Sequence, residues 1–333
     1  MISKISHQRA APTSGCSAHT FGVGIAMDGN ILSNEKEMYR IGKGGMIPNK
    51  VAEFHIDNAA GVIDRALEEA SIALREIECI GYTKGPGMGP CLQVGELTAK
   101  MLAARLHVPI VPVNHGIGHI EIARHFAGQN DPVVLYVSGG NSQILKIDAR
   151  PYRHYKVLGE TMDIGIGNMF DTFARGIGLD PAWGSTVEKA AQNGGYVELP
   201  YTVKGMDFSF TGLLTQALRL SGSVGREDLC FSLREISFSM LCETTERALM
   251  LTDSSELCVC GGVAQSQRLR EMLGLVAKEH GASFGFAPNE FNADNGGMIA
   301  FVAERMHRGN YHVPIERCGI LQRYRIEEAV VFG

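Results

Sequence analysis

The sequence contains two similar strand–turn–strand patterns, and these limit the fold more than any other feature. The first covers residues 19–32 and the second covers residues 133–147. Short apolar runs on either side of glycine-containing turns predict β-hairpins. After each pattern, stretches with helical spacing alternate with short apolar strands. This arrangement predicts an α/β fold with two lobes and a nucleotide cleft between them.

The length of 333 residues also favours two lobes over one core. We predict an N-terminal lobe over 1–130 and a C-terminal lobe over 131–333, with the final helix packing back toward the first lobe. Residues 1–18 are rich in Ser, Thr, Gln and Pro and lack strand-like alternation, so we expect them to be disordered or atypical. No apolar run reaches the roughly 18 residues of a membrane span, so we expect no membrane partner.

Charge and cysteine content bear on partners and compartment. The net charge is −5, whereas a protein that binds nucleic acid alone is usually basic. A nucleic acid would therefore need a local patch or other subunits. The richest basic segment is 146–156, which is equally consistent with a solvated hairpin face. The eight cysteines form no CxxC pair or disulfide pattern and we read no signal peptide, so we expect a cytoplasmic protein.

Two histidines follow a predicted buried strand. Asn114 is a plausible helix N-cap, and His115 and His119 would then share one face of the helix, one turn apart. This is the geometry of a two-point metal clamp, although an isolated pair with this spacing is more often one buried and one surface histidine. Gly116 and Gly118 lie in the same turn, where each costs roughly 1 kcal/mol relative to alanine. They indicate that something approaches the backbone closely.

The surroundings of the histidines argue against a metalloprotease. The zincin motif places its glutamate directly after the first histidine, and the inverted motif places it directly before the second. Those positions are Gly116 and Gly118, and Glu121 is rotated away from the face of the histidines.

Three glycine-containing loops are candidates for contact with a nucleotide. The backbone N–H groups of 138–141 can converge into an anion nest, and an ordinary tight hairpin explains the same residues equally well. Gly261 and Gly262 lie between a predicted strand and helix, where a base or ribose would meet no side chain. The loop 85–90 also opens a helix, but its prolines remove N–H donors and its anion-binding signal is weak.

Eight motifs, in one order, resemble those of a known family. They lie at 18–20, 85–90, 113–121, 135–141, 159–163, 203–207, 260–263 and 294–296. Together they extend over nearly the whole chain. The chain resembles the universal tRNA threonylcarbamoyladenosine-forming family, formerly labelled O-sialoglycoprotein endopeptidase. It is most similar to the archaeal/eukaryotic branch, the catalytic subunit of the KEOPS complex.

The resemblance implies the two-lobed actin/Hsp70/sugar-kinase (ASKHA) fold and a tRNA N6-adenosine threonylcarbamoyltransferase. Such an enzyme moves threonylcarbamoyl from threonylcarbamoyl-adenylate to the adenosine next to the anticodon. The implied partners are tRNA, which an acidic chain would hold weakly alone, and three KEOPS subunits. These are a small protein kinase, a small dimerising subunit on the N-terminal lobe and a tRNA-binding subunit. The alternative is a nucleotide-binding, ATPase-like regulatory subunit of a multiprotein complex.

The resemblance further implies one divalent metal ion, iron or zinc. Its ligands would be His115, His119, Tyr136 and Asp294, a set that suits a catalytic metal with room for a substrate oxygen. Gly116 and Gly118 would then keep the helix turn thin where a phosphate and the metal approach. Taken alone, Asp294 is better explained as a helix N-cap and Tyr136 as a half-buried strand aromatic; only the resemblance favours ligation.

The implied nucleotide is ATP or threonylcarbamoyl-adenylate. The matching positions are Tyr136, Val137, Ser138, Gly139, Gly140 and Asn141 around the phosphates, Asp171, Gly184 and Glu188 on the nucleoside side, and Gly261, Gly262 and Ser266 near the base or ribose. The carboxylates would accept hydrogen bonds from ribose hydroxyls, or are simply solvated helix positions. Two positions depart from the family pattern, because Gly15 stands in place of a glutamate and Ser266 in place of an asparagine.

Overall fold

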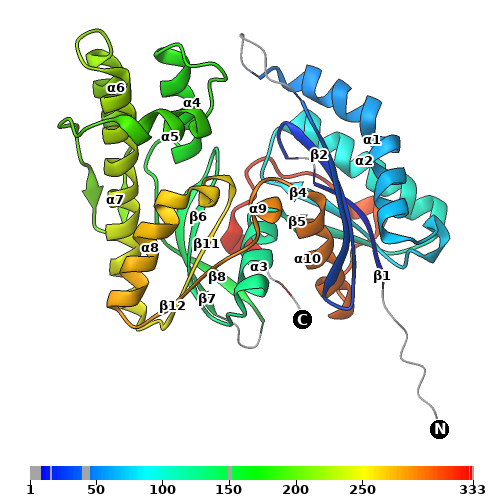
Figure 1. Ribbon diagram of the computed structural model, residues 1–333. Helices are drawn as coiled ribbons and strands as arrows, with labels where there is room; N and C mark the ends of the chain where they lie inside the picture. The colour runs from blue at the N-terminus through cyan, green and yellow to red at the C-terminus, as the bar shows by residue number, and fades with distance from the viewer. Residues whose placement is uncertain (1–8, 16, 40–45, 149–151, 330, 332–333) are drawn as a thin grey trace. The chain divides into compact units, whose positions relative to one another are not determined.

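The computed structural model describes residues 9–15, 17–39, 46–148, 152–329 and 331 (Figure 1). These residues divide into two compact units. The first is drawn from Met1–Ile122, Arg150–His154 and Asp294–Gly333, and the second from Ala123–Ala149 and Tyr155–Ala293. The sequence predicts lobes over 1–130 and 131–333 with the final helix packed back toward the first; in the structure the last long helix packs on the sheet of the first unit.

The first unit contains a five-stranded sheet in the order β3-β2-β1-β4-β5. The strands are β1 (Arg9–Gly15), β2 (Thr20–Met27), β3 (Asn30–Met38), β4 (Ile80–Gly85) and β5 (Ile110–Asn114). Neighbours among β1, β2 and β3 are antiparallel, whereas β4 and β5 extend the sheet in parallel. The helices are α1 (Pro48–Ala70), α2 (Gly89–Leu106), α10 (Gly296–Arg308), the start of α3 (His115–Ala127), and the short η1 (Leu74–Glu76), η4 (Ile315–Arg317) and η5 (Ile326–Glu328).

The turn between β2 and β3 confirms the first predicted hairpin. Asp28 has a φ of 53° and Gly29 a φ of 76°. Positive φ at both central residues is typical of a type I′ turn, whose twist matches that of the paired strands.

Strand β1 differs from the irregular start that we expected for 1–18. Residues 1–8 and 16 lie outside the described residues, but Arg9–Gly15 pairs with β2 on one side and with β4 on the other. A strand between two neighbours can satisfy its N–H and C=O groups on both edges, and this pairing outweighs weak local propensity. The expectation is therefore wrong for these seven residues.

Strand β2 has a different neighbour on each face. Phe21, Val23 and Ile25 belong to the apolar core that α1 covers. Gly22 and Gly24 point the other way and meet the first turn of α10, which lies on the opposite face of the sheet (Figure 1). A Cβ on Gly24 would lie 2.4 Å from a backbone nitrogen of α10, so only glycine allows this contact. The alternation of large and absent side chains therefore sets how closely α10 approaches.

The second unit also contains a five-stranded sheet, in the order β12-β11-β6-β7-β8. The strands are β6 (Val133–Val137), β7 (Ser142–Asp148), β8 (His154–Glu160), β11 (Glu256–Cys260) and β12 (Ser283–Phe286), and β9 (Val203–Lys204) with β10 (Asp207–Phe208) forms a small separate pair. The helices are α4 (Ile166–Gly176), α5 (Gly184–Ala190), α6 (Thr211–Leu220), α7 (Arg226–Thr252), α8 (Gln267–Glu279), α9 (Asn289–Asn292), and the short η2 (Ala191–Asn193) and η3 (Gly262–Gln265). The antiparallel pair β6–β7 confirms the second predicted hairpin.

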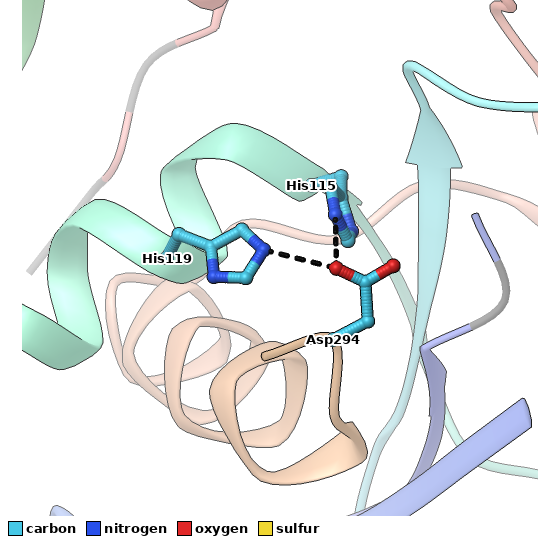
Figure 2. A group of neighbouring side chains, drawn as sticks. All are labelled: His115, His119 and Asp294. Atoms are coloured by element: carbon cyan, nitrogen blue, oxygen red, sulfur yellow. Dashed lines mark hydrogen bonds and ion pairs between the residues drawn. The ribbon is translucent and has the colours of Figure 1, made fainter. Parts of the chain in front are cut away.

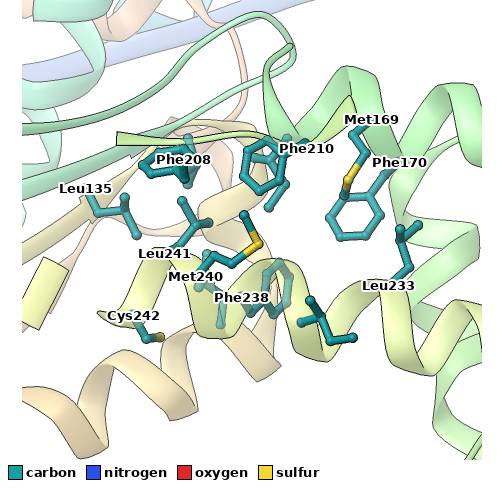
Figure 3. Close-up of a cluster of buried hydrophobic side chains, with 14 of the residues drawn as sticks. Leu135, Met169, Phe170, Phe208, Phe210, Leu233, Phe238, Met240, Leu241 and Cys242 are labelled. Carbon is teal, nitrogen blue, oxygen red and sulfur yellow. The ribbon is translucent and has the colours of Figure 1, made fainter. Parts of the chain in front are cut away.

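Helix α7 passes through the core of this unit. Figure 3 shows the surrounding cluster of buried side chains, in which Phe238 of α7 meets Phe170 of α4 edge to face, with ring centroids 5.9 Å apart. Such contacts bury α7 against the sheet and against its neighbouring helices. Although α7 is long, no helix of the described chain is long and apolar enough to cross a membrane.

Candidate functional site

Helix α3 begins directly after β5, and Asn114 determines where. Its Oδ1 accepts hydrogen bonds from the N–H groups of Gly116 (2.9 Å) and Ile117 (3.3 Å), which confirms the predicted N-cap. Its Nδ2 donates to the carbonyls of Tyr324 (3.2 Å) and Arg325 (3.3 Å). One side chain therefore fixes both the helix start and the C-terminal segment beside it.

Three of the four predicted metal ligands lie together (Figure 2). Nε2 of His115 and Nε2 of His119 are each 3.3 Å from Oδ1 of Asp294. Both histidines are buried, and the Asp294 side chain is 22% exposed. The two imidazoles share a face of α3 as their spacing predicts, and Asp294 reaches them from the residues before α10.

Asp294 does not cap α10. The N-cap is Asn295, whose Oδ1 accepts a hydrogen bond from the N–H of Met298 at 2.9 Å. The alternative interpretation of Asp294 as an N-cap is therefore wrong, and its carboxylate faces the histidines.

The charges at this cluster suit metal ligation. Burial opposes ionisation of Asp294, but charge and hydrogen bonds from His115 and His119 hold the pKa of its carboxyl well below the ordinary value. Burial lowers the pKa of His119, against the opposing effect of its bond to Asp294. An ionised carboxylate and a neutral imidazole are the forms that bind a metal cation.

The donor set also fits a divalent metal. Nε2 of each histidine lies 3.3 Å from the same carboxylate oxygen of Asp294. Lone pairs of an imidazole and a carboxylate repel each other unless a proton or a cation lies between them. Two histidines and one carboxylate are a common ligand set for zinc and for non-haem iron, with positions left for other ligands.

Ser17 also belongs to this cluster, although the sequence does not indicate it. Its Oγ is 3.3 Å from Nε2 of His115 and donates a hydrogen bond to Oδ2 of Asp294 at 3.1 Å. Ser17 lies in the segment that we expected to be irregular, and nothing in its local pattern indicates a site. Its signal is the neighbouring motif at 18–20.

Tyr136 lies at the end of β6 and belongs to the second unit, whereas the triad belongs to the first. It is fully buried rather than half-buried, and a Cβ on Gly261 would lie 3.3 Å from its ring. Its place in the ligand set stays a prediction.

The glycine at 118 has a packing reason within the first unit. A Cβ there would lie 3.0 Å from Cδ1 of Ile299 and 3.2 Å from Cγ of Met298. Side chains of α10 therefore approach this turn at Gly118. The glycine lets α10 pack closely on the helix that carries both histidines.

Glu121 is buried and faces Arg153, with 3.4 Å between Oε2 and Nη1. An acid held in such an ion pair is not available as the general base of a protease, which agrees with the argument from spacing.

Much of the basic segment 146–156 serves the fold. Lys146 is half-buried and hydrogen-bonded to Ser254, and Arg153 faces a buried carboxylate. His154 and Lys156 are exposed, and Arg150 lies outside the described residues. Two exposed side chains make a small basic surface.

The turn at 138–141 leaves two N–H groups available. The N–H of Ser138 donates to Asn141 O (2.8 Å), and the N–H of Asn168, on α4, donates to Gly139 O (2.9 Å). The N–H groups of Gly139 and Gly140 have no acceptor among the described residues, and neither glycine has a positive φ. The turn is therefore a hairpin held by backbone hydrogen bonds, with two N–H groups left open. It is not an anion nest, in which right-handed and left-handed backbone conformations alternate.

The two glycines after β11 differ in role. Gly261 has a φ of 96°, and a Cβ there would lie 2.2 Å from Val137 O, so the fold itself requires glycine. A Cβ on Gly262 would meet no atom of the described chain within 4 Å, and the same is true of Gly140. Parallel pairing of β6 with β11 aligns Tyr136 with Cys260, so both turns start at the same end of the sheet.

The remaining predicted nucleoside positions are joined by hydrogen bonds. Oδ1 of Asp171 accepts from the N–H of Gly184 at 2.9 Å. The hydroxyl of Ser266 donates to Oε2 of Glu188 at 2.8 Å and accepts from the N–H of Leu269 at 3.3 Å, which makes Ser266 the N-cap of α8. Burial raises the pKa of the Glu188 carboxyl. These contacts tie both carboxylates to neighbouring elements of the second unit.

The family model described as TsaD, tRNA N6-adenosine threonylcarbamoyltransferase, matches residues 29–301. The chain belongs to this family. It is 44% identical to the tRNA N6-adenosine threonylcarbamoyltransferase of Thermococcus kodakarensis over 94% of this chain and 96% of that protein. The TsaD relative from Thermofilum pendens is 45% identical over 94% of each chain. The "Probable bifunctional tRNA threonylcarbamoyladenosine biosynthesis protein" of Methanobrevibacter smithii is 46% identical, and this chain spans 58% of its length.

Solved structures with low sequence identity share the fold. The crystal structure of Thermococcus kodakarensis HypF has a TM-score of 0.63 at 14% identity and covers 90% of this chain, which spans 48% of HypF. Full-length HypF in a phosphate- and nucleotide-bound form has a TM-score of 0.58 at 13% identity, with 90% and 46% coverage. The fold of this TsaD-family chain is α/β and of the ASKHA type, as the resemblance implies.

Proposed function

We propose that this chain is a tRNA N6-adenosine threonylcarbamoyltransferase. The observation that carries the proposal is its identity of 44% over 94% of the chain with relatives of that name. The N6 amine of the adenosine next to the anticodon attacks the carbamoyl carbon of threonylcarbamoyl-adenylate. A nitrogen–carbon bond forms, the bond from that carbon to the adenylate oxygen breaks, AMP leaves, and the amine loses one proton. Alignment of the two substrates is the main contribution of the protein.

His115, His119 and Asp294 would hold one divalent metal ion, iron or zinc, with Tyr136 as a fourth ligand. The proposal for the first three rests on the 3.3 Å contacts between their donor atoms. The metal would supply Lewis acidity toward the carbamoyl carbonyl or the leaving phosphate. Ionised Asp294 balances part of the cation's charge, and burial keeps His119 neutral for ligation.

The second unit would bind the nucleotide, as ATP or as the adenylate. The open N–H groups of Gly139 and Gly140 suit a phosphate oxygen, because charge-assisted hydrogen bonds to backbone N–H groups are strong. The space beside Gly140 and Gly262 leaves room for a ligand close to the backbone.

The nucleoside half of this ligand would lie near two carboxylates. The carboxylates of Asp171 and Glu188 are the proposed acceptors for ribose hydroxyls, with Val137, Asn141, Gly184 and Gly261 lining the same site. Ser266 would act through Glu188, since its hydroxyl already donates to that carboxylate.

Partner subunits are part of the proposal, because a chain of net charge −5 holds tRNA weakly alone. An apolar groove of about 630 Å³ runs between α1 and α2, with Ile56, Leu97 and Met101 exposed along it. Exposed apolar patches of this kind mark interaction sites. The groove is where we propose that the small dimerising subunit docks, with the protein kinase and the tRNA-binding subunit of a KEOPS complex elsewhere. Because the substrate is tRNA, we propose that the chain acts in the cytoplasm.

Transfer can be measured directly. The chain is assembled with its partner subunits and given tRNA and threonylcarbamoyl-adenylate, and N6-threonylcarbamoyladenosine is quantified by mass spectrometry of the digested tRNA. We expect product with the unmodified chain and at least a 100-fold loss with His119→Ala. The matched control is His280→Ala, since His280 lies on the second unit and pairs with Glu246.

Two results would contradict the proposal. Absence of product from an assembled, metal-loaded complex that binds ATP would favour the ATPase-like regulatory subunit. Full transfer activity in His119→Ala would show that the reaction does not require the triad.

A further inference from the structure

We propose that Ser17 is a positioning residue of the metal centre, which sets the orientation of the Asp294 carboxylate. The proposal rests on the proposed metal role of His115, His119 and Asp294. Ser17 is 5% exposed, and its Oγ donates to Oδ2 of Asp294 at 3.1 Å.

The two oxygens of Asp294 have separate partners. Oδ1 is 3.3 Å from Nε2 of both His115 and His119, whereas Oδ2 is bonded to Ser17. Rotation about χ2 of an aspartate meets only a shallow barrier. A hydrogen bond to Oδ2 therefore fixes the direction in which Oδ1 points. Residues that orient ligands in this way contribute strongly to metal affinity.

The hydroxyl proton has two acceptors within reach. Oγ of Ser17 is also 3.3 Å from Nε2 of His115. A hydroxyl has one proton to donate, and ligation by Nε2 uses the lone pair of that nitrogen. Metal binding therefore directs the proton of Ser17 to Oδ2 of Asp294, where it orients the carboxylate.

The same three residues do not form a hydrolytic triad. In that arrangement the serine and the aspartate contact opposite nitrogens of the imidazole. Here Ser17 and Asp294 both lie beside Nε2 of His115. Ser17 is therefore not an activated nucleophile.

The glycine-rich loop 85–90 contacts the backbone of Ser17. The carbonyl of Ser17 accepts a hydrogen bond from the N–H of Met88 at 2.8 Å. A Cβ on Gly87 would lie 2.5 Å from that carbonyl oxygen and 3.0 Å from Cα of Ser17. Only glycine at 87 allows the loop to approach so closely. Close packing against Ser17 therefore explains Gly87 in the loop 85–90, whose sequence gives only a weak anion-binding signal.

The test measures metal affinity on the full chain without tRNA or donor. Metal-free protein is titrated with Co²⁺ and with Zn²⁺ against a chelating dye, and the visible spectrum of the Co²⁺ form is recorded. We expect Ser17→Ala to bind 10- to 100-fold more weakly with an altered Co²⁺ spectrum, and Ser17→Thr to stay within about threefold. The control is Ser33→Ala, which removes a buried hydroxyl from β3 of the same unit and should change neither reading.

Unfolding of the metal-free protein separates positioning from general damage. We expect Ser17→Ala to unfold near the wild-type temperature without metal but to gain less stability when metal is added. If Ser17→Ala does not fold, the isosteric pair Ser17→Thr and Ser17→Val repeats the comparison, since the two differ mainly in the hydroxyl.

The proposal is overturned if Ser17→Ala has the metal affinity and the Co²⁺ spectrum of the wild type. It is also overturned if Ser17→Thr and Ser17→Val bind the metal equally tightly. Intact metal binding without transfer to tRNA would contradict the proposed function alone.

Discussion

The contact between β2 and α10 can be tested by adding one methyl group. In Gly24→Ala the new Cβ would lie 2.4 Å from the backbone nitrogen of Gly297 and 2.5 Å from the carbonyl carbon of Gly296. Ordinary van der Waals contact begins at about 3.4 Å, so the two elements must separate by about 1 Å (3.4 − 2.4). Both obstructing atoms are backbone, so no side-chain rotation relieves the clash.

Two effects of this separation can be worked out. Overpacking costs typically 1–3 kcal/mol, and about 0.5–1 kcal/mol returns because alanine suits a strand better than glycine, which leaves a net loss of about 0–2.5 kcal/mol. Asp294 lies two residues before Gly296 and moves with it. A displacement of about 1 Å exceeds the roughly 0.2 Å tolerance of metal–ligand distances, so we expect metal affinity to fall at least tenfold.

The assays are urea unfolding and a Co²⁺ titration of the same preparations. The control is Gly61→Ala in α1, where the nearest atom to a new Cβ is Nη1 of Arg65 at 3.8 Å. The same chemical change should there stabilise the protein by up to about 1 kcal/mol and leave metal affinity unchanged. Wild-type stability and metal affinity in Gly24→Ala would refute the argument that this contact places Asp294.

Three further changes test other parts of the structure. Gly140→Ala places a methyl group where we propose a phosphate, in space that is open within the protein, so the unfolding midpoint should stay constant. ATP affinity, followed by the fluorescence of the sole tryptophan, should fall about tenfold. Unchanged ATP affinity would contradict a role for this turn in nucleotide binding. Burial would raise the pKa of Asp163, but hydrogen bonds from 209–211 and Ile164 hold it below the ordinary value, so its stabilisation is present above about pH 4 and is lost as the pH falls. The stability difference between wild type and Asp163→Asn, from thermal unfolding, should therefore shrink from pH 7 to pH 3, and a difference independent of pH would contradict this. Arg153→Met removes the cation facing buried Glu121 and should lower the free energy of unfolding, measured in urea, by about 3 kcal/mol. The double variant that adds Glu121→Gln should recover part of this stability. A decrease below about 1 kcal/mol in the single variant would contradict a stabilising ion pair.

Features set by near neighbours in the chain were predictable from the sequence. The hairpin at 28–29 follows from residues that tolerate positive φ, and the shared face of His115 and His119 follows from their spacing. The Asn114 cap depends on atoms two and three residues ahead. In each case the determining contacts lie within one turn.

Features set by distant segments were not predictable from local pattern. Ser17 reaches Asp294 across 277 positions of the chain, and no property of its own segment indicates that contact. Gly118 packs against Ile299, a contact that is decided by how α10 packs and not by the residues around Gly118. Only the family resemblance indicates Asp294 as a ligand, since its local sequence favours a helix cap.

The central claim is that the triad of His115, His119 and Asp294 holds a metal that transfer requires. The most direct measurement is the initial rate of N6-threonylcarbamoyladenosine formation in one preparation of the assembled complex, stripped of metal and reloaded in steps with occupancy determined at each step. We predict a rate proportional to occupancy, negligible at zero, and no reloading in His119→Ala. A metal-free complex that transfers as fast as the loaded one would contradict the account.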